Sequence, residues 1–363
     1  MKKINVGIIF GGKSAEHEVS LQSAKNVYEA IDKEKYNPIL IGIDKTGKWL
    51  MSEKTKFLIN SENPKLISLN QSGNQVTFVP ESRGEICSIT DQREYGSIDV
   101  AFPILHGPMG EDGTVQGFLK LANIPFVGSS VLGSAVGMDK DVMKRLLRDG
   151  GIPIAKFMAL GLDDEIPDFN TIVQHIGLPF FIKPANMGSS VGVRKVQREG
   201  DYLKAVKEAF SFDLKIILEE FIEGREIECS VLGNQKPMAS TIGEIRPTHE
   251  FYSYEAKYID ENGASLEIPA NLPEELNKQA RETAIRTFKV LSCEGLGRVD
   301  MFLKADGKII VNEINTIPGF TRISMYPRLW EASGISYPEL IDHLIQLAFE
   351  RFEREKKLRT SYW

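Results

Sequence analysis

The sequence has no long apolar run, no paired-cysteine motif and no basic segment interleaved with aromatic residues. Its apolar stretches are far shorter than the ~20 residues of a membrane-spanning helix, so no membrane segment is expected. The three cysteines, Cys87, Cys229 and Cys293, are widely spaced, which excludes a Cys-x-x-Cys zinc site and is typical of a reducing cytoplasm. The five histidines show no ligand spacing, and a net charge of -6 argues against nucleic-acid binding.

The N-terminus has basic residues and a short apolar run but no small-residue cleavage site. We therefore interpret Val6–Phe10 as a first β-strand and not as part of a signal peptide. Internal repeats and low-complexity segments are also missing. A length of 363 residues is too great for one ordinary core, which predicts two or three domains.

Residues 1–125 are predicted to alternate strands and helices, a pattern typical of a parallel sheet in an α/β domain. The segment Ser52–Ser97 has weak periodicity and is expected to be a surface excursion with short strands. A break is predicted near residues 127–130. The elements expected in the first region are the strands Val6–Phe10, Ile39–Asp44 and Ile98–Ile104 and the helix Ser20–Ile31.

Two further regions follow the break. The expected elements are the helices Met138–Asp149, Asp201–Phe210, Pro273–Leu291 and Pro338–Glu355 and the strands Ile154–Leu160, Pro179–Lys183, Lys215–Glu219 and Arg225–Leu232. An irregular stretch spans Thr248–Pro269, and a hairpin covers Gly297–Asn315.

This hairpin carries the strongest chemical signal. Two strand-like runs flank Asp306-Gly307, which favours a two-residue turn joining Ala305 to Lys308. Counting back from that turn places three cross-strand pairs on one face, namely Phe302–Val311, Asp300–Glu313 and Arg298–Asn315. Facing carboxylates repel, whereas magnesium is usually held by one or two carboxylates plus substrate phosphates. The alternative is a solvated face, and a slip of one residue would split the set between faces.

Two segments favour nucleotide binding. Lys183 and the loop Gly188-Ser189-Ser190 follow a strand, so a point charge and backbone N–H groups could surround phosphate oxygens. A simple Gly/Ser hairpin turn is the alternative. The strand Ile216–Glu219 ends in acids followed by Phe221, an arrangement that suits an adenine pocket.

Two loops at predicted strand ends are candidate substrate sites. Glu16 follows the Gly11-Gly12 turn, at the edge where α/β sheets bind ligands. It could equally be a first-turn acid favoured by the helix dipole. His106 begins the glycine-rich segment His106–Gly113 and is a candidate site residue. The alternative interpretation is a loop histidine that makes only a structural hydrogen bond.

Taken in order, these segments resemble the ATP-grasp superfamily and, within it, the D-alanine–D-alanine ligase family, from about residue 4 to about residue 350. The segments that carry the resemblance are Gly11–Ser20, His106–Gly113, Lys183–Ser190, Tyr254–Tyr258, Arg298-x-Asp300 and Glu313–Gly319.

The resemblance implies an α/β fold, α+β in its ATP-binding half, with an N-terminal parallel-sheet domain (1–127). A central ATP-grasp domain (128–222) and a C-terminal one (223–363, with a lid loop at 248–269) would sandwich ATP between antiparallel sheets. It implies ATP-dependent carboxylate–amine ligation of two D-alanines through D-alanyl phosphate, for peptidoglycan, by a cytoplasmic homodimer.

The resemblance also assigns roles to residues. The ATP contacts would be Lys140, Lys183, Gly188, Ser189, Ser190, Glu219, Glu220, Phe221, Ile222, Glu226 and Phe302. Two Mg²⁺ (or Mn²⁺) ions would be held by Asp300, Glu313 and Asn315. The first D-alanine would meet Glu16 and His106, and the second Lys257, Ser324 and Met325, where Met325 stands in place of a frequent leucine. Arg298 and the Gly319 N–H would stabilise the oxyanion, and Tyr258 and Ser189 would join Glu16 in a hydrogen-bonded triad.

Three other functions are alternatives to this one. A D-alanine–D-lactate ligase is the nearest, but such relatives typically lack a tyrosine at the position of Tyr258. A nucleotide-binding regulator without catalytic turnover is disfavoured, because the complete set of charged site residues is present. A nicotinamide oxidoreductase disagrees with Gly11-Gly12, because the third glycine of the fingerprint is missing.

Tyr258→Phe is expected to impair dipeptide formation more than ATP binding, because the phenol hydroxyl is a candidate proton relay on a closing lid. Dipeptide yield at limiting D-alanine, compared with ATP affinity, measures this. Unchanged dipeptide synthesis would remove Tyr258 from the mechanism.

Overall fold

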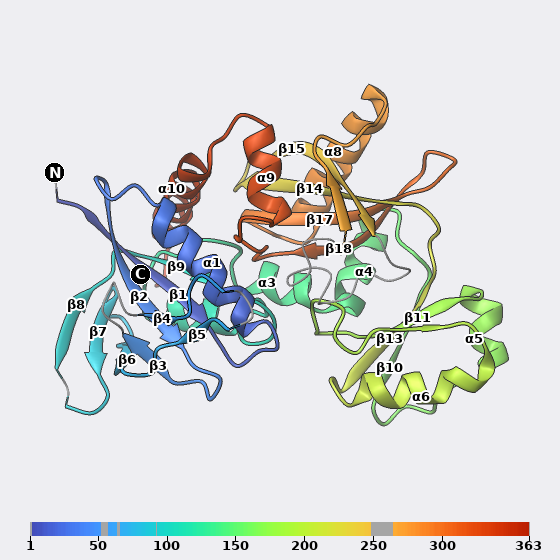
Figure 1. Cartoon of the computed structure of the whole chain (residues 1–363), viewed down its shortest axis with the longest axis horizontal. Helices are drawn as coiled ribbons and strands as arrows, with labels where there is room; N and C mark the ends of the chain where they lie inside the picture. The colour runs from blue at the N-terminus through green and yellow to red at the C-terminus, as the bar shows by residue number, and fades with distance from the viewer. Residues whose placement is uncertain (1, 52–56, 64–65, 92, 248–263, 363) are drawn as a thin grey trace.

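The computed structural model describes residues 2–51, 57–63, 66–91, 93–247 and 264–362. Within them the chain forms three sheets of four or more strands, and helices pack on each sheet (Figure 1). The sheets of β1–β9 and of β10–β13 lie at opposite ends of the view in Figure 1, with the sheet of β14–β18 between them. Lys257 and Tyr258, with most of the expected lid loop, lie outside the described residues.

The first sheet has the order β8-β7-β6-β3-β2-β1-β9. Its parallel part pairs β1 (Ile4–Gly11) with β2 (Tyr36–Ile43) and with β9 (Val100–Ile104), and α1 (His17–Ala30) packs on β1. The predicted parallel βαβ arrangement is confirmed for these elements. Apolar β-branched residues dominate the three strands because both faces of the sheet are covered.

The segment Ser52–Ser97 does contain short strands, but it is not a surface excursion. Three of its strands extend the first sheet in antiparallel fashion and bury Val76, Phe78 and Ile86. The alternation of buried and accessible residues was too short to reveal this from sequence. These three strands are β6 (Asn74–Phe78), β7 (Glu85–Ser88) and β8 (Glu94–Ser97), and β3 (Trp49–Met51), just before the segment, joins β6 to β2. Within the segment, β4 (Leu58–Ile59) pairs with β5 (Ser68–Leu69) separately.

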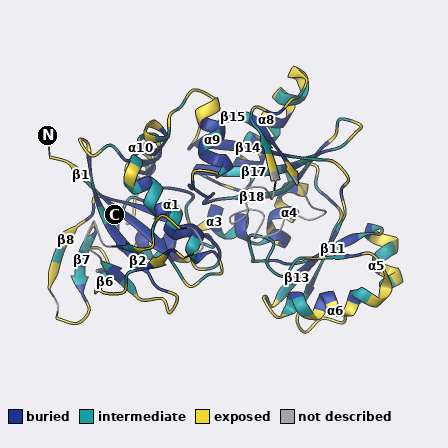
Figure 2. Ribbon diagram, in the orientation of Figure 1, coloured by how far each residue is buried: buried dark blue, intermediate teal, exposed yellow. Residues whose placement is uncertain are grey.

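The second sheet is antiparallel, in the order β10-β13-β11-β12. Two helices bury one face of it, around Phe180 and Val206 (Figure 2). The first of these helices was missed by the sequence analysis, although Asp168 caps its N-terminus by accepting from the Thr171 N–H. The bounds are β10 (Phe157–Gly161), α5 (Phe169–Ile176), β11 (Phe180–Pro184), β12 (Arg194–Val196), α6 (Glu199–Phe210) and β13 (Lys215–Glu220).

The third sheet is also antiparallel, in the order β16-β15-β14-β17-β18. One face packs on α8 (Glu274–Val290) and on α4 (Lys140–Asp149), which contributes Met143 and Leu147 to the same core. The opposite face packs on α9 (Met325–Ala332) around Ile245, and elsewhere it carries polar side chains. The strands are β14 (Arg225–Gly233), β15 (Met238–Pro247), β16 (Ala264–Glu267), β17 (Gly295–Leu303) and β18 (Ile309–Asn315).

The hairpin of β17 and β18 confirms two of the three predicted pairs, Arg298–Asn315 and Asp300–Glu313. The pair Phe302–Val311 is wrong, because Phe302 faces Ile310. The loop is also longer than predicted: the Lys304 and Lys308 backbones close it, and Gly307 adopts a φ of +83°. A β-bulge between Met301 and Asp300 then shifts the register back by one residue. The two deviations cancel at the acidic pair.

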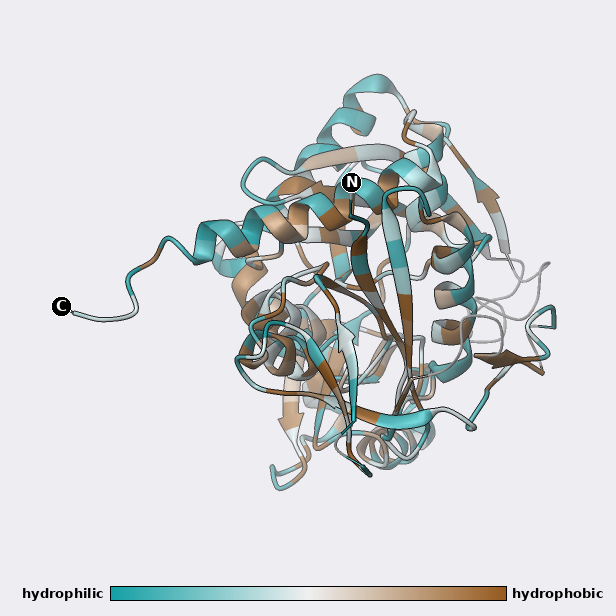
Figure 3. Ribbon diagram, turned by 90° about the vertical axis from the view of Figure 1, so that its left-hand side faces the viewer, coloured by the Kyte–Doolittle hydropathy of each residue, from teal (hydrophilic) through white to brown (hydrophobic). Residues whose placement is uncertain are grey.

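The C-terminal helices return to the N-terminal body. α9 (Met325–Ala332) and α10 (Tyr337–Glu355) add Tyr326, Trp330 and Leu344 to the core that contains β1. The apolar stripe of α10 turns inward, and the chain beyond it projects away from the body (Figure 3). Two short helices, α2 (Thr114–Leu121) and α3 (Val131–Met138), link this body to α4.

A buried cation ties α10 to the link that leaves the first sheet. Arg351 is 4% exposed and donates hydrogen bonds to the carbonyl oxygens of Phe126 and Gly128. Its guanidinium also stacks over the Phe126 ring at 4.3 Å. The chain therefore leaves the first sheet from a fixed position, just before α3 and α4.

Candidate active site

A cavity of about 560 Å³ lies between the second and third sheets. It brings together most of the predicted site residues from segments far apart in the sequence. Those that line it are Lys140, Lys183, Gly188, Ser189, Ser190, Glu219, Glu220, Phe221, Ile222, Glu226, Arg298, Asp300, Phe302, Glu313, Gly319, Ser324 and Met325. Glu16, His106 and Asn315 are not in the lining, but each contacts a residue close to it.

The polar face of the third sheet presents side chains in rows across three strands. On β14, β17 and β18, Glu228 lies opposite Asp300, which lies opposite Glu313. The next row contains Arg298 and Asn315 on β17 and β18. Strand alternation puts both rows on one face, so the cavity meets a small grid of charged and polar groups.

Arg298 neutralises the centre of this grid. Its Nε and Nη2 donate to the two carboxylate oxygens of Asp300, each at 2.7 Å, and Nε lies 2.9 Å from Oε2 of Glu228. The Nδ2 of Asn315 donates to Asp300 at 3.0 Å. Lys140 lies 3.5 Å from Glu313. The predicted repulsion between Asp300 and Glu313 is therefore offset by two cations.

The residues of this grid suit a magnesium-type ion. Asp300 and Glu313 supply carboxylate oxygens, and because Asn315 donates through Nδ2, its amide oxygen is the atom that could bind a cation. Among the described residues no group of three or more His, Cys, Asp or Glu could hold a metal ion unaided. Two carboxylates and an amide fit Mg²⁺, which is usually completed by substrate phosphates and water.

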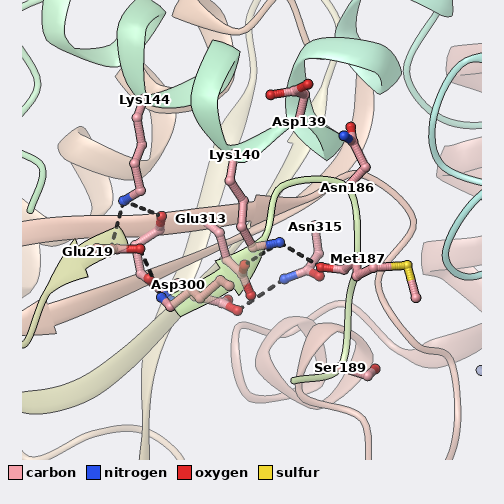
Figure 4. A network of polar contacts seen from close by, with 12 residues as sticks. Asp139, Lys140, Lys144, Asn186, Met187, Ser189, Glu219, Asp300, Glu313 and Asn315 are labelled. Carbon is pink, nitrogen blue, oxygen red and sulfur yellow. Dashed lines mark hydrogen bonds and ion pairs between the residues drawn. The ribbon is translucent and has the colours of Figure 1, made fainter. Parts of the chain in front are cut away.

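A second charged cluster, centred on Glu219 of β13, lies close to Glu313 (Figure 4). The Glu219 carboxylate, 2% exposed, lies 2.9 Å from Lys144 Nζ through Oε1 and 2.9 Å from Lys183 Nζ through Oε2. Burial alone would raise the pKa of Glu219, but the two ammonium groups outweigh burial and lower it. Glu219 is therefore an anion whose two oxygens are each paired with a lysine.

The loop after β11 has the backbone of a strained binding loop. Ser189 and Ser190 adopt φ values of +50° and +61°, a region that non-glycine residues rarely occupy and that clusters at functional sites. The Met187 carbonyl accepts a 2.7 Å hydrogen bond from Lys140. A Cβ atom on Gly188 would lie 2.9 Å from Glu16 Oε2, so glycine permits the close approach of this carboxylate.

Glu16 and its neighbours form a buried acidic corner beside the loop. The Ser189 hydroxyl donates to Glu16, which is 6% exposed. The Gly107 N–H donates to Glu111 at 2.8 Å. Burial, reinforced by the charge of Glu16, raises the pKa of Glu111 to about 8. Glu111 therefore holds its proton at neutral pH, because burial and the nearby Glu16 both disfavour its charged form.

His106 is buried at the edge of this corner. Its Nδ1 lies 3.0 Å from the Ile317 carbonyl oxygen, and its Nε2 lies 3.4 Å from the Ser23 hydroxyl. Burial, with a further contribution from the charge of Arg298, lowers the pKa of His106 to about 4. The ring is therefore neutral at physiological pH, with Nδ1 as the donor to Ile317.

Four buried ionisable residues in or beside the site were missed by the sequence analysis: Glu111, Lys144, Glu228 and Glu244. Lys144 follows Lys140 by four residues and so shares its face of α4, and Glu228 follows Glu226 by two residues on β14. These spacings were available signals. Glu111 lies within the His106–Gly113 segment, but its burial against Glu16 depends on the tertiary fold.

Comparisons with known proteins agree over the whole chain. Residues 5–129 match the family described as D-ala D-ala ligase N-terminus, and residues 146–346 match D-ala D-ala ligase C-terminus. A D-alanine–D-alanine ligase from Oceanobacillus iheyensis is 57% identical, with 99% of each chain covered.

Solved structures give the same result. The D-alanine–D-alanine ligase of Coxiella burnetii superposes with a TM-score of 0.86 at 38% identity, over 98% of this chain and 97% of that one. The VanG D-Ala:D-Ser ligase of Enterococcus faecalis gives a TM-score of 0.84 at 38% identity, over 96% of this chain and 100% of that one.

His106 is expected to titrate near pH 4 in the folded protein, well below the 6.5 of an exposed histidine. Because the folded state has the lower pKa, the stability contributed by the neutral ring is complete above pH 6.5. It is lost as pH falls toward 4, by at most about 3 kcal/mol. The NMR titration of the His106 ring protons measures the pKa, with His106→Gln identifying the signal. A midpoint near 6.5 would contradict the burial argument.

Proposed function

This chain belongs to the D-alanine–D-alanine ligase family, and from that premise we infer that it joins two D-alanines into D-alanyl-D-alanine with consumption of ATP. It is an ATP-dependent carboxylate–amine ligase whose product enters peptidoglycan precursors. The observation that supports this most is one cavity whose lining contains Lys140 and Lys183 together with Arg298, Asp300 and Glu313. Such a cavity can accept phosphates and a developing oxyanion at the same time.

We propose that ATP lies between the second and third sheets. Lys140 and Lys183 would neutralise its phosphates, and the loop of Gly188, Ser189 and Ser190 would close on them. The adenine and ribose would lie toward the end of β13 and the face of β14, where the cavity offers apolar and acidic groups. Those residues are Glu219, Glu220, Phe221, Ile222, Glu226 and Phe302.

We further propose that Asp300, Glu313 and Asn315 hold two Mg²⁺ or Mn²⁺ ions together with the ATP phosphates. The ions would neutralise the charge that builds up during phosphoryl transfer. On binding, Asp300 and Glu313 would exchange part of their pairing with Arg298 and Lys140 for metal contacts. Arg298 would then be available to the reacting carbonyl.

The two D-alanines are placed by the remaining polar groups. Glu16 would bind the ammonium of the first D-alanine, beside the neutral His106 ring. Ser324 and the Met325 backbone N–H would receive the carboxylate of the second. Lys257 would add a positive charge from the segment outside the described residues.

The chemistry follows from these positions. The γ-phosphoryl group of ATP passes to the first D-alanine carboxylate, because oxide is a poor leaving group and phosphate is a good one. The amine of the second D-alanine then attacks the D-alanyl phosphate, and phosphate leaves as the peptide bond forms. Arg298 and the Gly319 N–H stabilise the oxyanion, a role in which one lost donor typically costs about 10²–10³ in rate. Ser189 and Tyr258 are the proposed proton relay, and the 248–269 lid would exclude water.

The alternative of a D-alanine–D-lactate ligase is not favoured, since the relatives found over the whole chain are named D-alanine–D-alanine ligases. The VanG neighbour is named a D-Ala:D-Ser ligase, so D-serine is a useful second substrate to compare with D-alanine. A regulator without turnover is not supported either. The same relatives are named as ligases at 52–57% identity.

We propose three domains at 1–127, 128–222 and 223–363, each of which contains one of the three sheets. A homodimer in the cytoplasm is proposed on family resemblance alone, and sedimentation equilibrium would measure whether the mass is twice 40.6 kDa. No helix in the described part of the chain is long and apolar enough to cross a membrane.

Incubation of the protein with ATP, Mg²⁺ and D-alanine is expected to yield D-alanyl-D-alanine, ADP and phosphate in equal amounts. Chromatography measures the dipeptide, and L-alanine in place of D-alanine is the matched control. Labelling the D-alanine carboxylate with ¹⁸O should transfer the label to phosphate, because the acyl phosphate carries that oxygen. Absence of dipeptide would refute the ligase, and unlabelled phosphate would refute the acyl phosphate.

A further inference from the structure

Lys144 is a fully buried cation that the proposed mechanism does not use. Its side chain is 1% exposed, and its Nζ lies 2.9 Å from Glu219 Oε1 and 3.4 Å from the Asn312 carbonyl oxygen. It extends from α4 to β13 of the second sheet and β18 of the third. Burial lowers the pKa of Lys144, whereas the Glu219 charge opposes the decrease.

Lys144 lies behind the wall of the cavity. Lys183 and Glu219 line the cavity, whereas Lys144 pairs with the other oxygen of Glu219 and is not part of the lining. Figure 4 shows Lys144 reaching Glu219 from α4. The two lysines that share Glu219 are thus not equivalent. A ligand in the cavity can reach Lys183, but it can reach Lys144 only through Glu219.

Stability alone is a weak reason for such an arrangement. Replacing a buried ion pair by apolar residues of similar volume is often neutral or stabilising. α4 already packs through Met143 and Leu147 into an apolar core, so an apolar residue at position 144 would be the simpler solution. A buried lysine that pairs with an acid of the cavity instead indicates that ligand binding requires a second positive charge beside that acid.

The second positive charge beside Glu219 becomes necessary when ATP binds. Lys183 can neutralise a phosphate only by giving up part of its pairing with Glu219. A carboxylate that is 2% exposed and loses its counter-charge would be strongly destabilised. Lys144 cannot leave, because it is enclosed, and so it keeps Glu219 charged and in place after Lys183 has turned toward the phosphate.

We propose that Lys144 is a positioning residue for ATP: it is the permanent counter-ion of Glu219, which releases Lys183 to bind phosphate. The inference rests on the proposed binding of ATP in this cavity. Lys144 acts through Glu219 and touches no substrate, so its effect must disappear when Glu219 carries no charge.

The test is a double-mutant cycle read by the Kd of ATP, measured by calorimetry with Mg²⁺ and without D-alanine. Lys144→Met should weaken ATP binding at least about tenfold, because Lys183 must then stay with Glu219. In a Glu219→Gln background the same change should alter the Kd less than about threefold. Steady-state KM for D-alanine should change less than about twofold, since neither lysine faces Glu16.

Arg194→Met is the matched control. Arg194 of β12 pairs with Glu208 of α6 at 2.6 and 2.9 Å, but Arg194 is solvent-exposed and lies outside the cavity lining. This variant should leave the Kd of ATP unchanged. If Lys144→Met does not fold, Lys144→Gln keeps a neutral donor to Glu219 and is compared in the same two backgrounds, with a smaller rise in Kd expected.

A purely structural role would appear as reduced thermal stability with an unchanged Kd of ATP, and this result would overturn the proposal. Equal weakening of ATP binding in the Glu219 and Gln backgrounds would overturn it as well, because the effect would not pass through Glu219. Failure of the ligase assignment looks different. In that case the unmodified protein forms no dipeptide, whereas the cycle is read from ATP binding and not from turnover.

Discussion

The pairing of opposite charges inside one cavity is the constraint on which the rest of the site depends. Asp300 and Glu313 lie side by side on β17 and β18 and would repel each other if they were alone. Arg298 pairs with Asp300 and Lys140 with Glu313, and Lys183 pairs with Glu219 on the second sheet. The cavity is therefore preorganised by its own ion pairs. A phosphate-bearing ligand and its metal ions carry the same charges and can replace these pairs.

The proposed exchange of pairs would account for the charged residues that lie behind those of the cavity. Lys183 shares the acid Glu219 with a second lysine, and Arg298 pairs with a second acid besides Asp300. Lys144 stays with Glu219, and Glu228 stays with Arg298 at 2.9 Å. When ligand takes Lys183, or metal takes Asp300, no buried charge is left alone. The electrostatic cost of binding ATP and metal would be reduced, because Lys144 and Glu228 are already paired with Glu219 and Arg298 before the ligand enters.

The sequence allowed much of this arrangement to be predicted, though partly by chance. The pair Asp300–Glu313 was correct only because a longer turn at Gly307 and a β-bulge offset each other. Both depend on local backbone choices that alternation patterns do not encode. Motif resemblance identified Lys183 and Glu219, whereas Lys144 escaped because a helical lysine is usually solvated. Its burial is created by α4 packing between two sheets, which only the tertiary structure shows.

We propose that Asp300 exchanges its pairing with Arg298 for a metal ion when ATP binds. Electron paramagnetic resonance of Mn²⁺ measures this most directly, with the protein titrated in the presence and absence of ATP. Tightly bound Mn²⁺ is expected to appear with ATP, and Asp300→Asn is expected to weaken its binding at least about tenfold. Mn²⁺ binding that is equally tight in Asp300→Asn would contradict the account, because the acid at the centre of the charge exchange would then hold no metal.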